Sequence, residues 1–99
     1  WVDKEGPGVG GFEKGQAVVV TIAGCGHCRY CARGWNQYCL HKGAQVGMGL
    51  DGGLAEYVVA PADAVVPVGD MDPADAAPLT DAGLSSYHAV KRVLPLLTA

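Results

Sequence analysis

The sequence predicts a mainly β fold that is interrupted by an irregular cysteine-containing lobe and followed by a C-terminal helix. A run of β-branched residues near the start suits a buried strand, and short apolar segments after a glycine turn suit further strands. Apolar side chains at three- and four-residue intervals indicate a helix at the end. With 99 residues, 49% of them hydrophobic, the chain has the composition of one small folded domain or of a piece of a larger one, with a packed core.

The expected strands follow from β-branched runs and from the residues that end them. The first is "AVVVTI", residues 17–22, whose continuous apolar character suits a sheet covered on both faces. The turn signal "DGG" precedes a second strand, expected at residues 54–60, which Pro61 ends. A further short strand is expected in "AVVPVG", residues 64–69.

Two helical segments are expected in the last third of the chain. In "MDPADAAPL", Asp72 suits the N-cap and Pro73 suits the first helical position. A longer helix is expected to begin near Thr80 or Asp81, because the segment "AGLSSYHAVKRVL" has helical periodicity. Pro95 should kink or end this helix, since its nitrogen cannot donate a backbone hydrogen bond.

The charge balance and the hydropathy argue against several functional classes. Lys and Arg total 7 and Asp and Glu total 10, which gives a net charge of −3 at pH 7. There is no basic stripe of the kind that binds a phosphate backbone, so a nucleic-acid partner is not expected. No apolar run approaches the roughly 20 residues that span a bilayer, and the opening "WVDKEGPG" has no signal-peptide features. We therefore expect a cytoplasmic protein, and the missing initiator Met suggests part of a longer chain.

The segment "GCGHCRYCARGWNQYC", residues 24–39, holds every cysteine, in the spacing C-x2-C-x2-C-x7-C. Disulfides are disfavoured because they would close very short loops. The first three cysteines match the start of an iron–sulfur ligand run, but that run continues with a cysteine after three residues and then a proline. The x7 arm favours a closed tetrahedral site of four thiolates around Zn²⁺. The residues alone thus favour structural zinc, with an iron–sulfur cluster as the alternative.

With its flanking segments, the cysteine run resembles the zinc-dependent medium-chain alcohol dehydrogenases, of the bacterial NAD-dependent secondary-alcohol and aryl-alcohol type. The matching segments are "GPGVGGFEKGQAVVV", "GLDGGLAEYVVAPADAVVPVGD" and "AAPLTDAGLSSYHAVKR", with Gln16 in place of the usual Asp. The resemblance implies a partial GroES-like catalytic domain at residues 1–80, with the zinc lobe at 24–43. It also implies that residues 81–99 are a helix leading toward a dinucleotide-binding Rossmann domain that is missing from this sequence.

The resemblance further implies which residues form the sites. The lobe would hold a structural zinc through Cys25, Cys28, Cys31 and Cys39. Asp81, where many members have Cys, would be the third ligand of a separate catalytic zinc, whose other two ligands, a Cys and a His, would lie upstream of this sequence. From the residues alone, Asp81 is instead a good helix N-cap, and Thr80 would take over the cap if the carboxylate turned to a metal. Ser85 matches the family position that contacts the nicotinamide.

The implied function is reversible hydride transfer between a primary or secondary alcohol, or its aldehyde or ketone, and NAD(H) at the catalytic zinc. The isolated chain is expected to be inactive, because it has no G-x-G-x-x-G loop and lacks two zinc ligands. The full-length protein is expected to be a homo-oligomer, a dimer or tetramer, and Trp35 and Tyr38 are expected to cover the lobe or to form a subunit contact. The alternatives from another class are a non-catalytic zinc-stapled binding module and an iron–sulfur electron-transfer module.

Overall fold

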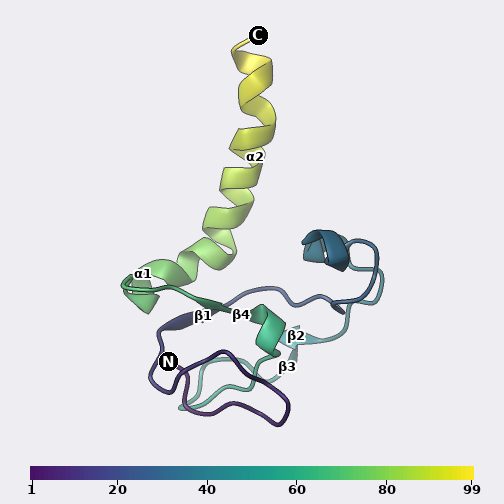
Figure 1. Ribbon diagram of the computed structural model, residues 1–99. Coiled ribbons are helices and arrows are strands. Elements are labelled where there is room, and N and C mark those ends of the chain that lie inside the picture. The colour runs from purple at the N-terminus through teal and green to yellow at the C-terminus, as the bar shows by residue number, and fades with distance from the viewer.

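A computed structural model describes residues 1–99 and shows three parts: a β body, a lobe that contains the cysteines, and a long projecting helix (Figure 1). We call residues 24–43 the cysteine lobe. The Cα radius of gyration is 15.3 Å, and the principal extents are 49 × 32 × 25 Å. A compact domain of this length has a radius of gyration of about 13 Å. The chain is therefore extended, because the lobe and the helix both stand away from the body.

The body is built on an antiparallel pair of strands, β1 (Val18–Val20) and β4 (Val65–Pro67). Val19 lies opposite Val66 in the register. Both strands coincide with the expected β-branched segments, although each is shorter than expected. The expectation that the first strand is covered on both faces is wrong: all three β1 residues are only half-buried, because the strand has one neighbouring strand and one helical layer.

The strand expected at residues 54–60 is absent, and this expectation is wrong. The segment is irregular, and the side chains of Leu54 and Val59 are almost fully exposed. Its apolar residues have β propensity but no neighbouring strand, and isolated strands are not stable without a ladder partner. Two unexpected two-residue strands, β2 (Gln45–Val46) and β3 (Gly49–Leu50), pair with each other just before this segment.

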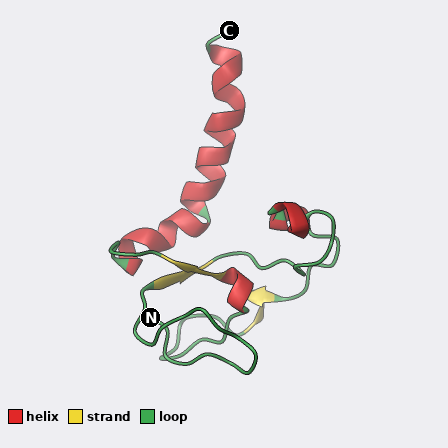
Figure 2. Ribbon diagram, viewed as in Figure 1, coloured by secondary structure: helices red, strands yellow, loops and turns green.

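The short helix α1 (Pro73–Ala76) is capped as the sequence predicts. Asp72 Oδ1 accepts a hydrogen bond of 2.8 Å from the amide of Ala74, and Pro73 begins the helix. A 3₁₀ helix, η4 (Ala77–Thr80), continues from α1 toward the long helix. Both α1 and η4 pack on β1, and together they form a helical layer on one face of the strand pair (Figure 2).

The long helix α2 (Ala82–Leu97) begins where helical periodicity predicts and projects away from the body (Figures 1 and 2). It contains no buried residue. Pro95 does not end the helix, contrary to one of the two outcomes expected for it; the helix continues for two more residues, to Leu97. The hydroxyl and the amide of Thr98 then both bond to the carbonyl of Leu94, at 3.0 and 3.1 Å, and close the last turn. No helix in the chain is long and apolar enough to cross a membrane.

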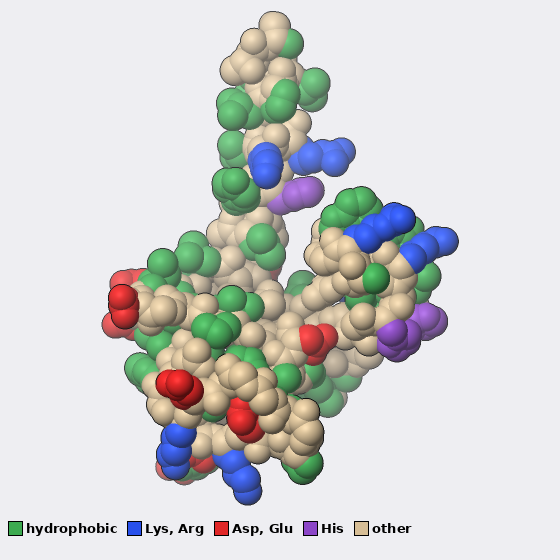
Figure 3. All heavy atoms as spheres, viewed as in Figure 1, with side chains coloured by type: hydrophobic (Ala, Val, Ile, Leu, Met, Phe, Trp, Pro, Cys, Tyr) green, Lys and Arg blue, Asp and Glu red, His purple; other side chains and the backbone are tan.

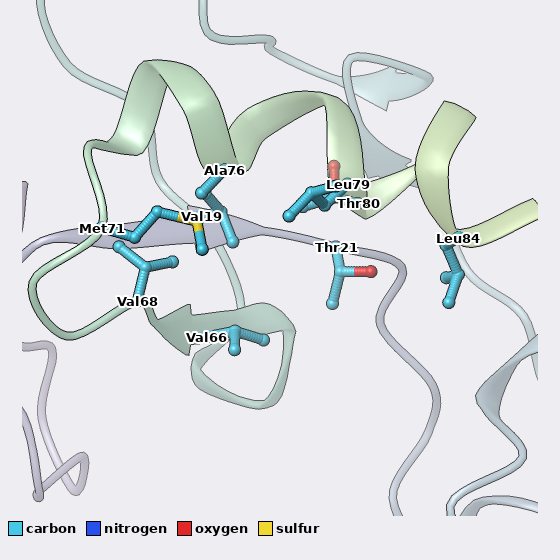
Figure 4. A pocket seen from close by; sticks show the side chains of 9 residues that line it. All are labelled: Val19, Thr21, Val66, Val68, Met71, Ala76, Leu79, Thr80 and Leu84. Carbon is cyan, nitrogen blue, oxygen red and sulfur yellow. The ribbon is translucent and has the colours of Figure 1, made fainter. Parts of the chain in front are cut away.

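The chain forms almost no core of its own, contrary to the expectation from its composition. Only Cys28, Ala64 and Ala76 are buried. Between the strand pair and the α1–η4 layer lies an apolar hollow of about 330 Å³, and Figure 4 shows Val19, Val68, Met71 and Leu79 among the side chains that line it. A β pair with one helical layer leaves apolar faces without a second packed layer. The chain has the apolar composition of a folded domain, but this segment alone does not bury its apolar side chains.

Candidate metal centre

Short turns and one side chain fold the cysteine lobe. Two 3₁₀ helices, η1 (Cys31–Arg33) and η2 (Asn36–Tyr38), shape its tip, so the lobe expected to be irregular contains two short helical turns. The base of the lobe is closed by Gln45. The side-chain oxygen of Gln45 accepts a 3.0 Å hydrogen bond from the amide of Ala23, and its side-chain nitrogen donates at 3.3 Å to the carbonyl of Ala23. We call this pair of hydrogen bonds the Gln45 clamp.

The four cysteine sulfurs, which the sequence predicts as one site, lie together in the lobe. All four Sγ atoms are within 4.8 Å of one another, and those of Cys25 and Cys31 are 4.0 Å apart. All four thiols are free, so the disulfide alternative is not observed. A tetrahedral zinc with Zn–S bonds of about 2.3 Å needs sulfurs about 3.8 Å apart. The cluster therefore fits a single ion after small shifts, whereas a four-iron cluster would hold the thiolates on its outside and farther apart.

Backbone amides donate hydrogen bonds to three of the four sulfurs, those of Cys25, Cys28 and Cys39. The amide of Cys25 donates to Cys39 Sγ at 3.3 Å, and the amide of Cys28 donates to Cys25 Sγ at 3.3 Å. Cys31 N donates to Cys28 Sγ at 3.5 Å, and His41 N donates to Cys39 Sγ at 3.3 Å. Amide hydrogen bonds to a charged acceptor favour the ionised form, so these contacts favour thiolates at Cys28 and Cys39.

The pKa values of the thiols differ according to these contacts. The amides of Cys31 and Leu40 lower the pKa of Cys28 to about 5. The amide of Cys25 lowers the pKa of Cys39, and desolvation raises the pKa of Cys31 to about 11. At neutral pH, Cys28 thus offers a thiolate and Cys39 ionises more readily than an ordinary thiol. Cys31 has to release a proton when a metal binds, since only the thiolate is a ligand.

Gly24 allows the sulfurs to come together. A Cβ atom at this position would press against Cys31 Sγ and would lie 3.2 Å from the side chain of Asn36. Only glycine fits there without displacing a sulfur. Gly43, at the other end of the lobe, would present its Cβ to open space. Neither the close approach at Gly24 nor the Gln45 clamp was expected from the sequence, although a glycine immediately before the first cysteine is a usable signal.

The two histidines of the lobe lie beside the cluster and are not part of it. The rings of His27 and His41 stack, with centroids 5.7 Å apart and an interplanar angle of 18°. His27 Nδ1 lies 2.7 Å from the carbonyl oxygen of Cys25. The group of side chains close enough to hold one metal contains the four cysteines and no histidine.

Asp81 lies apart from the cysteine lobe, at the N-cap position of α2. Its side chain makes no capping hydrogen bond, so the capping role expected from the residues alone is not observed. The Thr80 hydroxyl donates to the carbonyl of Ala77 at 2.9 Å, so Thr80 does not take over the cap. Within this chain, no group of three or more His, Cys, Asp or Glu side chains close enough to hold one metal ion includes Asp81.

Ser85 follows Asp81 by one helical turn. The amide of Ser85 donates to the backbone carbonyl of Asp81 at 2.9 Å, which joins the first turn of α2 to the residue before it. Both side chains are exposed. The expected roles of Asp81 as a catalytic-zinc ligand and of Ser85 as a nicotinamide contact stay predictions.

Comparisons with known proteins agree with the cysteine pattern. A family model described as "Alcohol dehydrogenase GroES-like domain" matches residues 1–70. One protein of Geobacillus stearothermophilus, named "Alcohol dehydrogenase", is 44% identical over 68 residues, which cover 68% of this chain and 20% of that protein. Another of the same name and organism is 38% identical over 93 residues, which cover 91% of this chain and 27% of that protein. The chain thus spans about a fifth to a quarter of the length of these relatives.

Proposed function

The chain belongs to the alcohol dehydrogenase family with a GroES-like domain, and from that premise we propose that it is part of an oxidoreductase. The proposed reaction transfers a hydride between a primary or secondary alcohol, or its aldehyde or ketone, and NAD(H). Because the chain spans only a fraction of its relatives, the activity is proposed for a protein that contains this segment and not for the segment alone. The proposal includes a cytoplasmic location.

The observation that carries the proposal is the cluster of four free sulfurs within 4.8 Å of one another. We assign this cluster as a structural zinc site. Four cysteines would fill the tetrahedral shell and leave no position for a substrate, which distinguishes a structural zinc from a catalytic one. The lobe has only Cys28 buried and so has no apolar core. A metal bound to all four thiolates would supply the cross-link that packing does not.

The reaction itself would involve the start of α2. We propose Asp81 as one ligand of a second, catalytic zinc, because its carboxylate oxygens are exposed and take no part in helix capping. Carboxylate oxygens bind zinc well. When bound, the zinc supplies Lewis acidity toward the alcohol oxygen and the nicotinamide accepts the hydride. The remaining ligands would come from residues outside this chain.

Within that site, this chain's own contribution is to position groups. The Ser85 amide bonds to the carbonyl of Asp81, and this contact fixes the backbone of Asp81 relative to the first turn of α2. The hydroxyl of Ser85 lies one turn beyond the carboxylate, on the same side of the helix. We propose that this hydroxyl donates to a polar group of the nicotinamide when the cofactor is bound.

Two measurements test the proposal. Purified protein should be colourless and should contain about one zinc per chain in this segment, released by reagents that modify thiols. A brown protein with broad absorbance at about 400 nm would instead indicate an iron–sulfur cluster. In a full-length protein, Asp81→Ala should remove the catalytic zinc and the NAD-dependent oxidation of alcohols while the zinc of the cysteine lobe stays bound. Retention of full activity in Asp81→Ala would contradict the catalytic assignment.

A further inference from the structure

The side chain of Gln45 bonds to the backbone at both ends of the cysteine lobe. Besides the two hydrogen bonds of the Gln45 clamp, its Nε2 atom donates to the carbonyl oxygen of Gly43, at 3.3 Å. Ala23 immediately precedes the lobe and Gly43 is its last residue, so one carboxamide holds both junctions. The backbone of Gln45 is itself fixed outside the lobe, because its amide donates to the carbonyl of Met48 at 2.9 Å.

Within this chain, no hydrogen bond other than those of Gln45 ties the lobe to the body. The remaining hydrogen bonds of residues 24–43 join residues of the lobe to one another. The closely packed pairs of helices and strands include neither η1 nor η2. Figure 3 shows the lobe as a separate mass beside the body. The start of the lobe is therefore anchored by the Gln45 clamp.

The segment 23–25 leads directly from the clamp to the sulfurs. Gly24 lies against Cys31 Sγ, since a Cβ at this position would press on that atom. The amide of Cys25 donates to Cys39 Sγ at 3.3 Å. The segment belongs to no helix or strand, and a glycine backbone is conformationally free. Its contacts with two of the four sulfurs therefore depend on an anchor outside the segment.

The clamp fixes the direction of this backbone as well as its place. The N–H and the C=O of Ala23 both bond to one carboxamide, at 3.0 and 3.3 Å. A strand residue in an antiparallel ladder bonds to its opposite residue through the same two groups. A single hydrogen bond would leave the peptide free to turn about it, whereas two bonds hold it as a neighbouring strand would.

We propose that Gln45 is a positioning residue of the metal site: its carboxamide holds segment 23–25 against the sulfurs of Cys31 and Cys39, and the zinc affinity of the lobe depends on this contact. The inference rests on the proposed structural zinc and adds a residue that binds no metal itself. An anchored segment has already lost conformational freedom that metal binding would otherwise remove, so the ion binds more tightly. Residues that orient metal ligands typically contribute about 10- to 100-fold to metal affinity.

The first test removes the carboxamide and keeps the length of the side chain. Gln45→Met should weaken zinc binding by the lobe about tenfold in the full-length protein, measured by competition with a chromophoric chelator. Gln37→Met makes the same change at an exposed position of η2 and should leave the affinity unchanged. Cys39→Ser identifies which of the bound zinc belongs to the lobe.

A double-mutant cycle with Gly24→Ala distinguishes positioning from a general loss of stability. The added methyl group is forced against Cys31 Sγ because the clamp holds the segment in place. Without the clamp the segment can move away from the sulfur. Gly24→Ala should therefore cost at least about threefold less zinc affinity in the Gln45→Met background than it does alone. Two substitutions that act separately would instead have effects that multiply.

The inference is overturned if Gln45→Met keeps the original zinc affinity, or if the effects of the two substitutions multiply. Absence of zinc from the lobe of the unaltered protein would instead contradict the structural zinc site, so the two failures are distinguishable. If Gln45→Met does not fold in excess zinc, Gln45→Glu takes its place in the cycle with the same expected results. This variant keeps the acceptor for the Ala23 amide and loses both donated hydrogen bonds.

Discussion

The cysteine lobe and α2 both project from the same small body, yet they are ordered in opposite ways. The lobe has little regular structure, but its amides, its glycine and its four sulfurs converge on one point within it. α2 is a regular 16-residue helix, and no residue of it is buried. An isolated helix of this length is marginal in water. The irregular lobe therefore carries the four ligands of a proposed metal, which would order it locally. The regular helix depends on packing from elsewhere.

The largest effect is expected from removing one cysteine ligand of the proposed zinc, which should disorder the lobe and leave α2 unchanged. Cys39→Ser should abolish stoichiometric zinc binding and disorder the lobe, because apparent free energies of structural zinc sites are about 10–16 kcal/mol. Limited proteolysis should then cut within residues 24–43, while the rate of cleavage in α2 stays as before. Ala32→Ser, an exposed position in the same lobe, is the matched control. Zinc retained at one equivalent by Cys39→Ser would show that the fourth thiolate is dispensable.

A second test changes the space around the sulfurs and leaves all of them in place. Gly24→Ala puts a methyl group against Cys31 Sγ and should weaken zinc affinity about ten- to a hundredfold. Gly43→Ala lies in the same lobe with open space around its Cβ, so its affinity should be unchanged. Competition with a chromophoric chelator measures both. Equal affinities for the two variants would mean that the lobe relaxes around the methyl group without cost.

A third test uses pH. Desolvation raises the pKa of Cys31 to about 11, so this thiol is protonated at physiological pH in the metal-free lobe. Zinc binding has to displace that proton, because only the thiolate is a ligand. Raising the pH therefore favours the zinc form, and the apparent zinc affinity should rise at least about tenfold per pH unit between roughly pH 6 and 9. The same chelator titration at several pH values measures this slope. An affinity independent of pH would contradict the protonated state of Cys31.

The smallest effect is expected in α2. Pro95→Ala restores a backbone donor near the end of the helix and should stabilise its last turn by about 1 kcal/mol, less than the ~3 kcal/mol of a helix interior, because the last turn frays. Far-UV circular dichroism should show slightly more helix, while zinc affinity stays the same. An increase in helix content together with a change in zinc affinity would show that the lobe and α2 are coupled. It would contradict the claim that the two parts are ordered independently.

The sequence predicted those features whose cause is local. The cysteine spacing predicted one cluster, and Asp72 with Pro73 predicted the start of α1, because a cap acts on amides two residues away. The periodicity after Asp81 predicted α2, because side chains three and four residues apart lie on one face of a helix. Each of these signals lies within a few residues of the structure that it specifies.

The features that escaped prediction depend on distant partners. Residues 54–60 have the composition of a strand but no neighbouring strand, so the segment stays irregular. The Gln45 clamp joins residues 22 positions apart, and no short sequence pattern indicates it. Asp81 has the residue type and position of an N-cap but not the hydrogen bond, since its φ of −135° and ψ of −75° do not aim the carboxylate at the helix amides.

The Gln45 clamp has a consequence for how this domain can change over evolution. Because the side chain of Gln45 holds Ala23 at 3.0 Å, the two ends of the intervening segment meet at a narrow neck just beyond the strand pair. A segment whose ends meet can be lengthened, shortened or exchanged without altering the spacing of β1 and β4. The four-cysteine unit is in this sense a cassette: it can be lost from one lineage or transplanted to another protein through a single pair of junctions.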